Sequence, residues 1–370
     1  METQISPGLW ALAWRRLRAD KSAMLAMTIV LLFLLLLLLS ATGLVAGDWE
    51  NEVGVNYAPP TFVGAQNADE RIAGASARTA VTAEAPPENP LDPLKETIRQ
   101  LRAESAGAQG PVINYYGIVD PIGKEMAEIR AELAKAGSKA ALVRKETLPF
   151  GADKWGHDII KKTIKGSETS IVVGLVAALL ATVLGTVFGA VSGYFGNAVD
   201  DFFNWFYSIF TSVPNMLLIM AVAAVLQHKG VTTIVLILGL TGWTGTYRLI
   251  RAEYMKHKTR EYVLAAGAIG ASHWSRIFSH IFPNVSHVAL VQMSILSVGF
   301  IKAEVILSFL GFGVPVGVVS WGSMLNEAQN ELILGKWWQL TAASLAMALL
   351  VSAFSLFTDA LRDALDPKLK

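Results

Sequence analysis

The sequence has no cysteine among its 370 residues. This absence excludes a disulfide framework, thiolate catalysis, cysteine-held iron–sulfur clusters and cysteine-ligated zinc. Charged residues are also few, at 16% of the chain, whereas soluble proteins average about 25%. The net charge of +1 gives no electrostatic case for a nucleic-acid partner.

A phosphate-binding loop is missing as well. Its pattern, Gly-x-x-x-x-Gly-Lys-Ser/Thr, occurs nowhere, because Gly123-Lys124 and Gly335-Lys336 lack both the preceding glycine and the following hydroxyl residue. The apolar stretches also lack the paired aspartates or the His-Glu-x-x-His motif that an intramembrane enzyme would need. The sequence therefore predicts that this chain is not an enzyme and that it holds no cofactor or metal ion of its own.

Apolar residues make up 53% of the sequence and are concentrated in long runs. Residues 23–44 carry no charge, and at about 1.5 Å per residue they cross a hydrocarbon core of about 30 Å. Because a signal peptide has an apolar region of only about 7–15 residues, an uncleaved signal-anchor is favoured over a cleaved signal peptide. Basic residues at 15–21 place the N-terminus in the cytoplasm, with 1–22 forming an amphipathic helix on the membrane surface.

Further apolar stretches lie at 171–191, 203–226, 231–249, 285–310 and 340–357. Together with the first they predict an all-α membrane protein of six transmembrane helices. The loop after the fourth span is rich in lysine and arginine, whereas the loop after the fifth holds only Lys336, so both termini are expected in the cytoplasm. The predicted division is 1–22 cytoplasmic N-terminus, 23–46 first transmembrane helix, 47–165 external insertion, 166–358 five-helix transmembrane domain and 359–370 cytoplasmic C-terminus.

The insertion at 47–165 is rich in proline, alanine, glycine and charge, and contains no apolar window long enough to span a membrane. Asp92-Pro93 and Asp120-Pro121 each combine a helix N-cap with proline at the first helical position. Each pair also introduces an apolar stripe at helical spacing. We therefore expect a partly ordered external segment with two short helices, and a linker at 65–89.

The cytoplasmic loop 251–284 contains Glu261-Tyr-Val-Leu-Ala-Ala-Gly-Ala-Ile-Gly270, followed by Ser272 and Pro283. This pattern predicts two short helices at an angle. Gly270 is expected to adopt the positive φ that ends the first helix, Ser272 to cap the second, and Pro283 to end it before the next span. Three small residues leave the first helix thin on one side, so that it could seat in a groove of another protein: Ala265, Ala266 and Gly267.

This loop resembles the one in permease subunits of bacterial ABC importers, which reads Glu-Ala-Ala, three residues, Gly, nine residues, then Ile-x-Leu-Pro. Ala265, Ala266, Gly270 and Pro283 match in register, whereas Leu264 replaces the glutamate of the family. The resemblance implies that the loop couples transport to an ATPase. Glu261 lies one helical turn before Leu264, so we expect its carboxylate to stand in for the missing acid, with Leu264 adding apolar contact.

The resemblance covers the first span and about residues 148–368, and it points to the C-type permeases of the dipeptide, oligopeptide and nickel branch. The motifs that carry it follow the order of the branch: Gly151-Ala-Asp-Lys-Trp-Gly156-His-Asp158, Gly193-Tyr-Phe-Gly196 with Asp200, Leu307-Ser-Phe-Leu-Gly-Phe-Gly313, Ser320-Trp-Gly322 and Leu361-Arg-Asp-x-Leu-Asp-Pro367. The insertion between Gly47 and Phe150 lies outside the resemblance.

The resemblance implies a type I importer fold in the bacterial cytoplasmic (inner) membrane. The chain would be the permease subunit of an ATP-driven importer for peptides and would form half of the translocation path. It would pair with a second permease, in a heterodimer, sit on two ATPase subunits that bind the ATP, and receive substrate from an external binding protein. Another substrate of the branch, such as a nickel chelate or microcin-like peptide, and a non-transporting membrane assembly protein are the alternatives at this stage.

Two ionisable residues, Lys302 and Glu304, lie in the fifth span. A charged side chain inside a membrane is energetically costly, so its presence there indicates a substrate or ion pathway. Two residues apart on a helix, they do not face each other, so each needs a partner of its own. For Glu304 the sequence allows two roles: an ion pair with another helix or subunit, or a place in the substrate path or gate.

Two further patterns predict packing. Glycines at four-residue spacing in the second span leave a face where another helix backbone can approach: Gly185, Gly189 and Gly193. Tryptophans flanking the last external loop are typical of an interfacial belt, with an aromatic lid over the pathway as the alternative: Trp321, Trp337 and Trp338.

Overall fold

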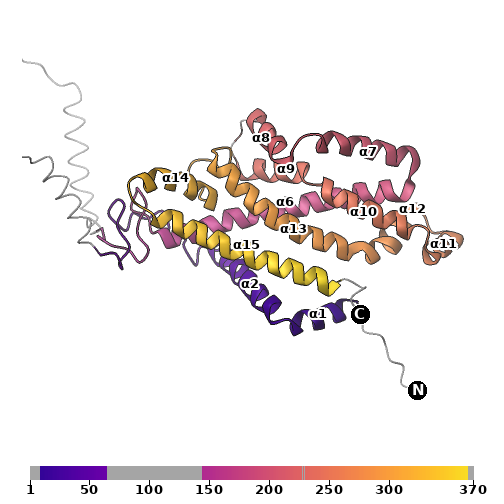
Figure 1. Cartoon of the computed structure of the whole chain (residues 1–370), viewed down its shortest axis with the longest axis horizontal. Helices are drawn as coiled ribbons and strands as arrows, with labels where there is room; N and C mark the ends of the chain where they lie inside the picture. Colours follow the sequence, from indigo (N-terminus) through magenta and orange to yellow (C-terminus); the bar gives the residue numbers. More distant parts are fainter. Residues whose placement is uncertain (1–8, 65–143, 227, 229, 366–370) are drawn as a thin grey trace, which may run out of the picture. The chain divides into compact units, whose positions relative to one another are not determined.

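The computed structural model describes residues 9–64, 144–226, 228 and 230–365. The chain divides into two compact units, Met1–Phe62 with Glu146–Lys370, and Val63–Lys145. The second unit lies almost wholly outside the described residues, and so do the helices expected after Asp92 and Asp120 and the linker at 65–89. The first unit is a bundle of α-helices (Figure 1).

The described elements of the bundle are helical throughout, with one π-helical segment, η1. In chain order they are α1 (Leu9–Ala19), α2 (Lys21–Ala41), α6 (Ile159–Phe195), α7 (Asn197–Thr211), α8 (Asn215–Leu226), α9 (Val231–Thr241), α10 (Thr244–His257), α11 (Glu261–Ala268), α12 (His273–Ser275), η1 (Arg276–Ile281), α13 (Phe282–Phe309), α14 (Trp321–Ile333) and α15 (Trp338–Leu365).

Aspartate caps fix where α2 and α6 begin. Asp20 accepts a hydrogen bond from the backbone N–H of Ser22 at 2.8 Å, and Asp158 accepts one from that of Ile160 at 2.8 Å. Because of the Asp158 cap, α6 starts earlier than the domain boundary at 166 that the sequence suggested. Its 37 residues reach about 55 Å, well beyond a hydrocarbon core of about 30 Å.

Within the described part of the chain, five helical segments are long and apolar enough to cross a membrane, or six if α7 and α8 together form one span. The predicted third span, 203–226, is therefore not one straight helix, because α7 and α8 are bent by 82° at the break between them. Pro214 accounts for the break, since it has no N–H to donate and disfavours the helical conformation of Val213.

Pro283 does not end a helix, contrary to the prediction. The chain stays helical from His273 to Phe309, and η1 precedes the proline. Within η1 the turn widens, so that the backbone N–H of Phe282 donates to the carbonyl of Ile277. The wider turn makes room for the proline ring, which has no N–H to donate to the preceding turn. Because the helix is continuous, the fifth span begins well before residue 285.

The centre of the bundle is α6, which packs against α10, α13 and α9. A Cβ atom at Gly185, Gly189 or Gly193 would lie 2.6 to 2.8 Å from a carbonyl oxygen of residues 243–251. Only glycine allows such a close approach of α10, so the predicted glycine packing face is confirmed.

The tryptophans near α14 pack inward, and the predicted interfacial belt is wrong for two of them. Trp321 is 0% exposed, and its Nε1–H donates to the carbonyl of Thr163 at 3.1 Å. Trp338 is 4% exposed and donates to the carbonyl of Ala152 at 2.7 Å. Each indole finds an acceptor inside the protein, which makes burial favourable. Trp337 is partly exposed.

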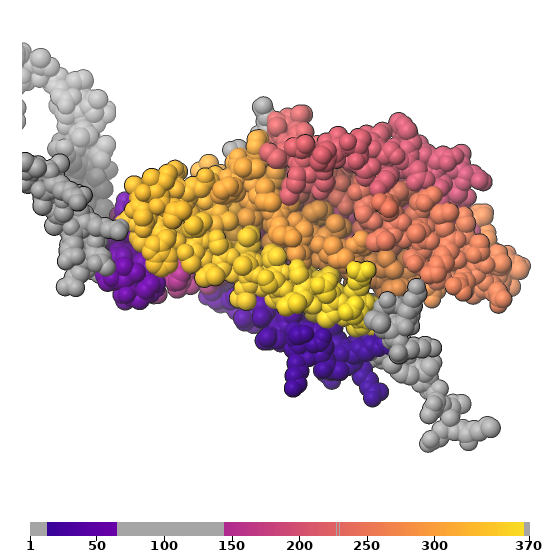
Figure 2. Space-filling view, in the orientation of Figure 1, coloured from indigo at the N-terminus to yellow at the C-terminus, as the bar shows by residue number. Residues whose placement is uncertain are grey.

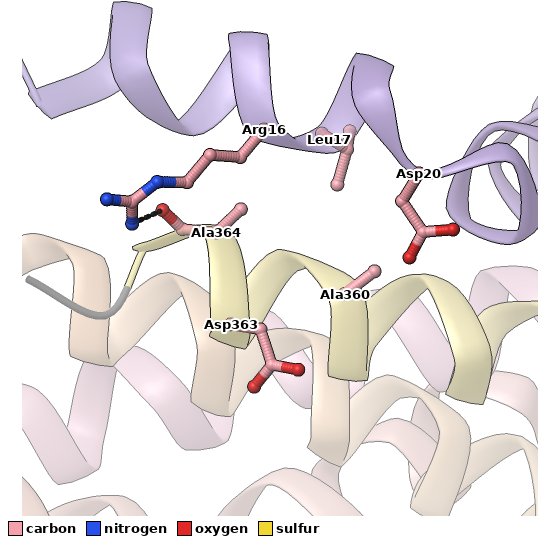
Figure 3. Close-up of a pocket in the computed structure, with 6 residues that line it drawn as sticks. All are labelled: Arg16, Leu17, Asp20, Ala360, Asp363 and Ala364. Atoms are coloured by element: carbon pink, nitrogen blue, oxygen red, sulfur yellow. Dashed lines mark hydrogen bonds between the residues drawn. The ribbon is translucent and has the colours of Figure 1, made fainter. Parts of the chain in front are cut away.

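The N-terminal helix α1 packs against the last turns of α15. Ala13 and Leu17 are buried there beside Ala364 and Leu365, so this part of the apolar face of α1 contacts protein. Arg16 Nη1 donates to the carbonyl of Ala364 at 3.5 Å (Figure 3). The contact borders a cavity of about 230 Å³. Its lining combines one cation and two carboxylates with three apolar residues: Arg16, Asp20 and Asp363, and Leu17, Ala360 and Ala364.

Candidate functional site

The loop between α10 and α13 lies at the end of the bundle opposite α14 (Figure 1). Gly270, just beyond α11, has a φ of 89°, and Ser272 accepts a hydrogen bond from the backbone N–H of Ser275 at 3.2 Å. Both features were predicted and are confirmed. A glycine is needed at 270 because other residues adopt this backbone conformation only at a cost. The loop therefore has a defined shape set by its own sequence.

Buried contacts fix the loop to the body of the protein. Val263 and Ile277 belong to the same buried cluster as Tyr254 of α10. The phenol of Tyr254 donates to the carbonyl of Ile277 at 3.1 Å, and the hydroxyl of Tyr194, at the end of α6, lies 3.0 Å from His273 Nδ1. The loop is thus tied to both α10 and α6.

A tyrosine–histidine pair adds to this attachment at the start of α11. The Tyr262 hydroxyl oxygen lies 2.8 Å from His257 Nδ1. Partial burial raises the pKa of Tyr262. The phenol therefore stays neutral at physiological pH, and the pair carries no phenolate charge.

The structure divides the predicted coupling residues between two faces of α11. Glu261, Leu264 and Ala265 are exposed, and Leu264 is 59% exposed. Ala266 is buried, and a Cβ atom on Gly267 would lie 2.9 Å from Arg276 Nη1. Ala266 thus lies on the packed side of α11, and Gly267 leaves room for the Arg276 side chain, while the outward face combines an acid with apolar surface. Gly270 and Pro283 are also exposed.

Three large apolar side chains on the same loop were missed by the sequence reasoning. Ile269 is 86% exposed, Trp274 57% and Phe278 42%, and the rings of Trp274 and Phe278 stack at 5.9 Å. For two of them the signal in the sequence is the Trp–Phe pair four residues apart, which places both rings on one helical face. Exposed apolar side chains of this kind mark a contact surface for another protein or for the membrane.

Lys302 and Glu304 lie on different faces of α13, as their spacing predicted. Lys302 is exposed, whereas Glu304 is fully buried. The Glu304 carboxylate accepts hydrogen bonds from the hydroxyls of Ser170 at 2.6 Å and Ser308 at 2.7 Å. Glu304 therefore joins α6 to α13 inside this chain.

A second polar cluster lies near α14, at the other end of the bundle. Lys162 is 3% exposed, and its ammonium donates to Asp153 at 2.7 Å and to Glu327 at 2.6 Å. Burial by itself raises the pKa of Asp153, but the charge and hydrogen bond of Lys162 outweigh it and hold that pKa below its ordinary value. Nearby, Glu331 is 2% exposed, and neither of its carboxyl oxygens has a side-chain hydrogen-bond partner among the residues that the structure describes.

Comparison with known protein families finds two matches. A model described as the binding-protein-dependent transport system inner membrane component matches residues 185–370. A second, the N-terminal TM domain of oligopeptide transport permease C, matches residues 8–60. Residues 61–184 lie between the two matches.

Individual proteins similar to this chain are transport permeases. The dipeptide transport system permease protein DppC of Bacillus subtilis is 36% identical over 221 residues, which cover 60% of this chain and 69% of that protein. The oligopeptide transport system permease protein OppC of the same organism is 35% identical over 221 residues, covering 60% and 72%. The peptidoglycan transport system permease protein YejE of Agrobacterium fabrum is 33% identical over 219 residues, covering 59% and 57%.

Proposed function

This chain belongs to the family of inner membrane components of binding-protein-dependent transport systems, and from that premise we propose how it works as the permease subunit of a peptide importer. It is a multi-pass protein of the inner membrane and not an enzyme. We propose that it forms half of the translocation path beside a second permease, as a heterodimer. The external binding protein would deliver the peptide, and two ATPase subunits would supply the energy.

The observation that carries the proposal is the outward face of α11 and the residues after it. Glu261 and Leu264 are exposed on one side of a helix whose other side is buried. An acid beside apolar surface suits a groove that offers basic or amide groups around an apolar floor. We propose that Glu261, Leu264 and Ala265 contact an ATPase, while Ala266, Gly267, Gly270 and Pro283 hold the loop in shape.

Substitutions in this loop test the proposal. Gly270→Val should separate ATP hydrolysis from peptide uptake, because the positive φ disfavours a branched side chain by about 1 kcal/mol or more. Gly317→Val is the matched control, since Gly317 has a similar positive φ of 90° and open space for a Cβ but lies outside this loop, before α14. Glu261→Ala should uncouple in the same way, whereas Leu264→Glu should be tolerated.

The measurement compares uptake with hydrolysis in proteoliposomes that contain the permeases, the ATPases and the binding protein. The expected result is continued hydrolysis with reduced uptake in Gly270→Val and Glu261→Ala. Wild-type coupling in Gly270→Val would remove the loop from the mechanism. Wild-type coupling in Glu261→Ala would show that this acid does not replace the one missing at Leu264.

Lys302 and Glu304 are proposed to act on the path or its gate in different ways. The Lys302 side chain is exposed on α13, where it can face the path or the second permease. The Glu304 carboxylate is enclosed, so its influence on a gate would pass through the helices that it joins.

A further inference from the structure

The helix α7 is held to the bundle more loosely than its neighbours. None of its residues is buried, and Phe202, 56% exposed, and Trp205, 62% exposed, project outward. On its other side, the rings of Phe206 and Phe210 contact that of Trp243. The helix lies at the edge of the bundle (Figure 1, Figure 2), and the bend before α8 ends it. Aromatic contacts hold α7 against the bundle, and its charged contacts fix its orientation there.

The strongest of those contacts joins the first turn of α7 to α10. Both nitrogens on one edge of the Arg251 guanidinium reach Asp200: Nε lies 2.6 Å from Oδ1, and Nη2 lies 2.6 Å from Oδ2. The hydroxyl of Ser192, on α6, donates to the same carboxylate. Paired, charge-assisted hydrogen bonds of this geometry are strong and fix orientation as well as distance.

The same helix that carries Arg251 also holds the loop of the candidate site. Tyr254, three residues after Arg251 on α10, donates to the carbonyl of Ile277 at 3.1 Å. The two residues lie within one turn of a continuous helix, Thr244–His257. Since a helix of this length moves as a rigid body, a displacement of the loop at Ile277 displaces Arg251 as well.

A second, weaker set of contacts ties the middle of α7 to α10. The hydroxyl of Tyr247 donates to the side-chain oxygen of Asn204 at 3.2 Å, and the rings of Phe206 and Trp243 stack at 5.4 Å. Arg248 Nη1 adds a longer hydrogen bond to the Tyr207 hydroxyl at 3.4 Å. The paired contact of Asp200 with Arg251 is the shorter link, and it lies at the end of α7 nearest the loop.

We propose that Asp200 and Arg251 are positioning residues that transmit movement of the α10–α13 loop through α10 to α7. The inference rests on the proposed coupling function of the loop. The pair touches neither ATP nor substrate. Its role is to make the position of α7, and hence the exposed surface with Phe202 and Trp205, depend on the state of the ATPases.

The test uses Asp200→Asn in the complete reconstituted importer. Uptake per ATP hydrolysed should fall roughly tenfold while hydrolysis continues, since removal of one charge breaks the paired contact but leaves both side chains in place. The matched control is Asp201→Asn, the next residue on α7, which is exposed. It should keep the wild-type ratio. The double variant Asp200→Arg with Arg251→Asp should regain part of the lost coupling.

A distance measurement separates positioning from a purely structural role. The absence of cysteine allows spin labels at introduced cysteines alone, here replacing Trp205 on α7 and Leu356 on α15, both exposed. Trapping the ATPases with nucleotide should shift the label distance in the otherwise wild-type complex and not in Asp200→Asn. An equal shift in both, or an equal loss of coupling in Asp201→Asn, would overturn the inference.

The two sets of variants separate failure of this inference from failure of the proposed coupling role of the loop. If Gly270→Val uncouples transport but Asp200→Asn does not, the loop couples without this pair, and only the present inference fails. If Gly270→Val stays fully coupled, the proposed coupling role of the loop fails first, and any nucleotide-dependent movement of α7 must start elsewhere.

Discussion

Two buried carboxyl groups near α14 differ in how their charge is compensated. Asp153 accepts hydrogen bonds from Lys162 and from the backbone N–H groups of Trp155 at 2.8 Å and His157 at 2.9 Å. Glu331 has no side-chain hydrogen-bond partner in the described part of the chain, and burial raises its pKa to about 7. At neutral pH Asp153 is therefore ionised, whereas Glu331 is partly protonated.

These opposite shifts predict opposite dependences of stability on pH. Glu331 holds a proton more tightly when folded, where its pKa is about 7, than when unfolded, where it is 4.5. Its contribution to the free energy of unfolding therefore falls as the pH rises through that interval. In Glu331→Gln, the thermal stability of the purified protein should fall less between about pH 5 and about pH 8 than in the wild type.

Asp153→Asn serves as the contrast for this measurement. The pKa of Asp153 is lowered in the fold, so its contribution is present above the ordinary value of 3.8 and is lost only in acid. The variant should be less stable than the wild type across the whole interval, because Lys162 loses a charged partner. A pH profile of Glu331→Gln identical to the wild type would show that Glu331 does not titrate there.

At the scale of elements, composition predicted which segments are helical better than where the helices bend. Two prolines show why. Pro214 breaks the predicted third span into α7 and α8, whereas Pro283 sits in a continuous helix behind η1. Proline removes the same donor in both places, but whether the chain bends or widens its turn depends on the packing around it, which local sequence does not encode.

The candidate site shows the same limit. The turn at Gly270 and the cap at Ser272 follow from local conformational preference, and both were predicted correctly. Which face of α11 points outward depends on Val263 and Ile277 meeting Tyr254 of α10, a contact between distant segments. The exposed Trp274 could be found only once that arrangement was known.

Glu304 connects elements that are far apart in the chain, and its replacement should loosen them together. Each serine hydroxyl that donates to Glu304 also accepts a backbone N–H: Ser170 from Trp321 at 3.2 Å, and Ser308 from Val314 at 3.3 Å. An amide at position 304 can accept from only one of these hydroxyls. Glu304→Gln should therefore lower stability by about 1–3 kcal/mol, measured by thermal unfolding.

Uptake at matched protein levels distinguishes the two roles of Glu304. Asp201→Asn is the control for exchange of a carboxyl for an amide, because its side chain is exposed and outside this network. Reduced stability with unchanged uptake across peptides would make Glu304 a structural link alone. Unchanged stability and unchanged uptake would contradict both the network argument and the proposed gate.

At the scale of the whole molecule, the bundle has two chemically different ends. The loop of α11 and α12 lies at one end and α14 at the other (Figure 1). The basic residues that follow the fourth span, among them Arg251, Lys256 and Arg260, belong to the end with α11. Since basic loops stay in the cytoplasm, α11 should face the ATPases and α14 the external side.

Cysteine accessibility tests this orientation, because the natural sequence contributes no background thiol. Val316, before α14, and Ser272, beside α11, are both exposed, so a cysteine at either position can react without unfolding. On intact cells, a membrane-impermeant thiol reagent should label Val316→Cys and leave Ser272→Cys unmodified. Ser272→Cys should react once the membrane is opened, which controls for its reactivity. Labelling of position 272 but not of 316 on intact cells would place α11 outside, away from any cytoplasmic ATPase, and would contradict the coupling mechanism as well as the orientation.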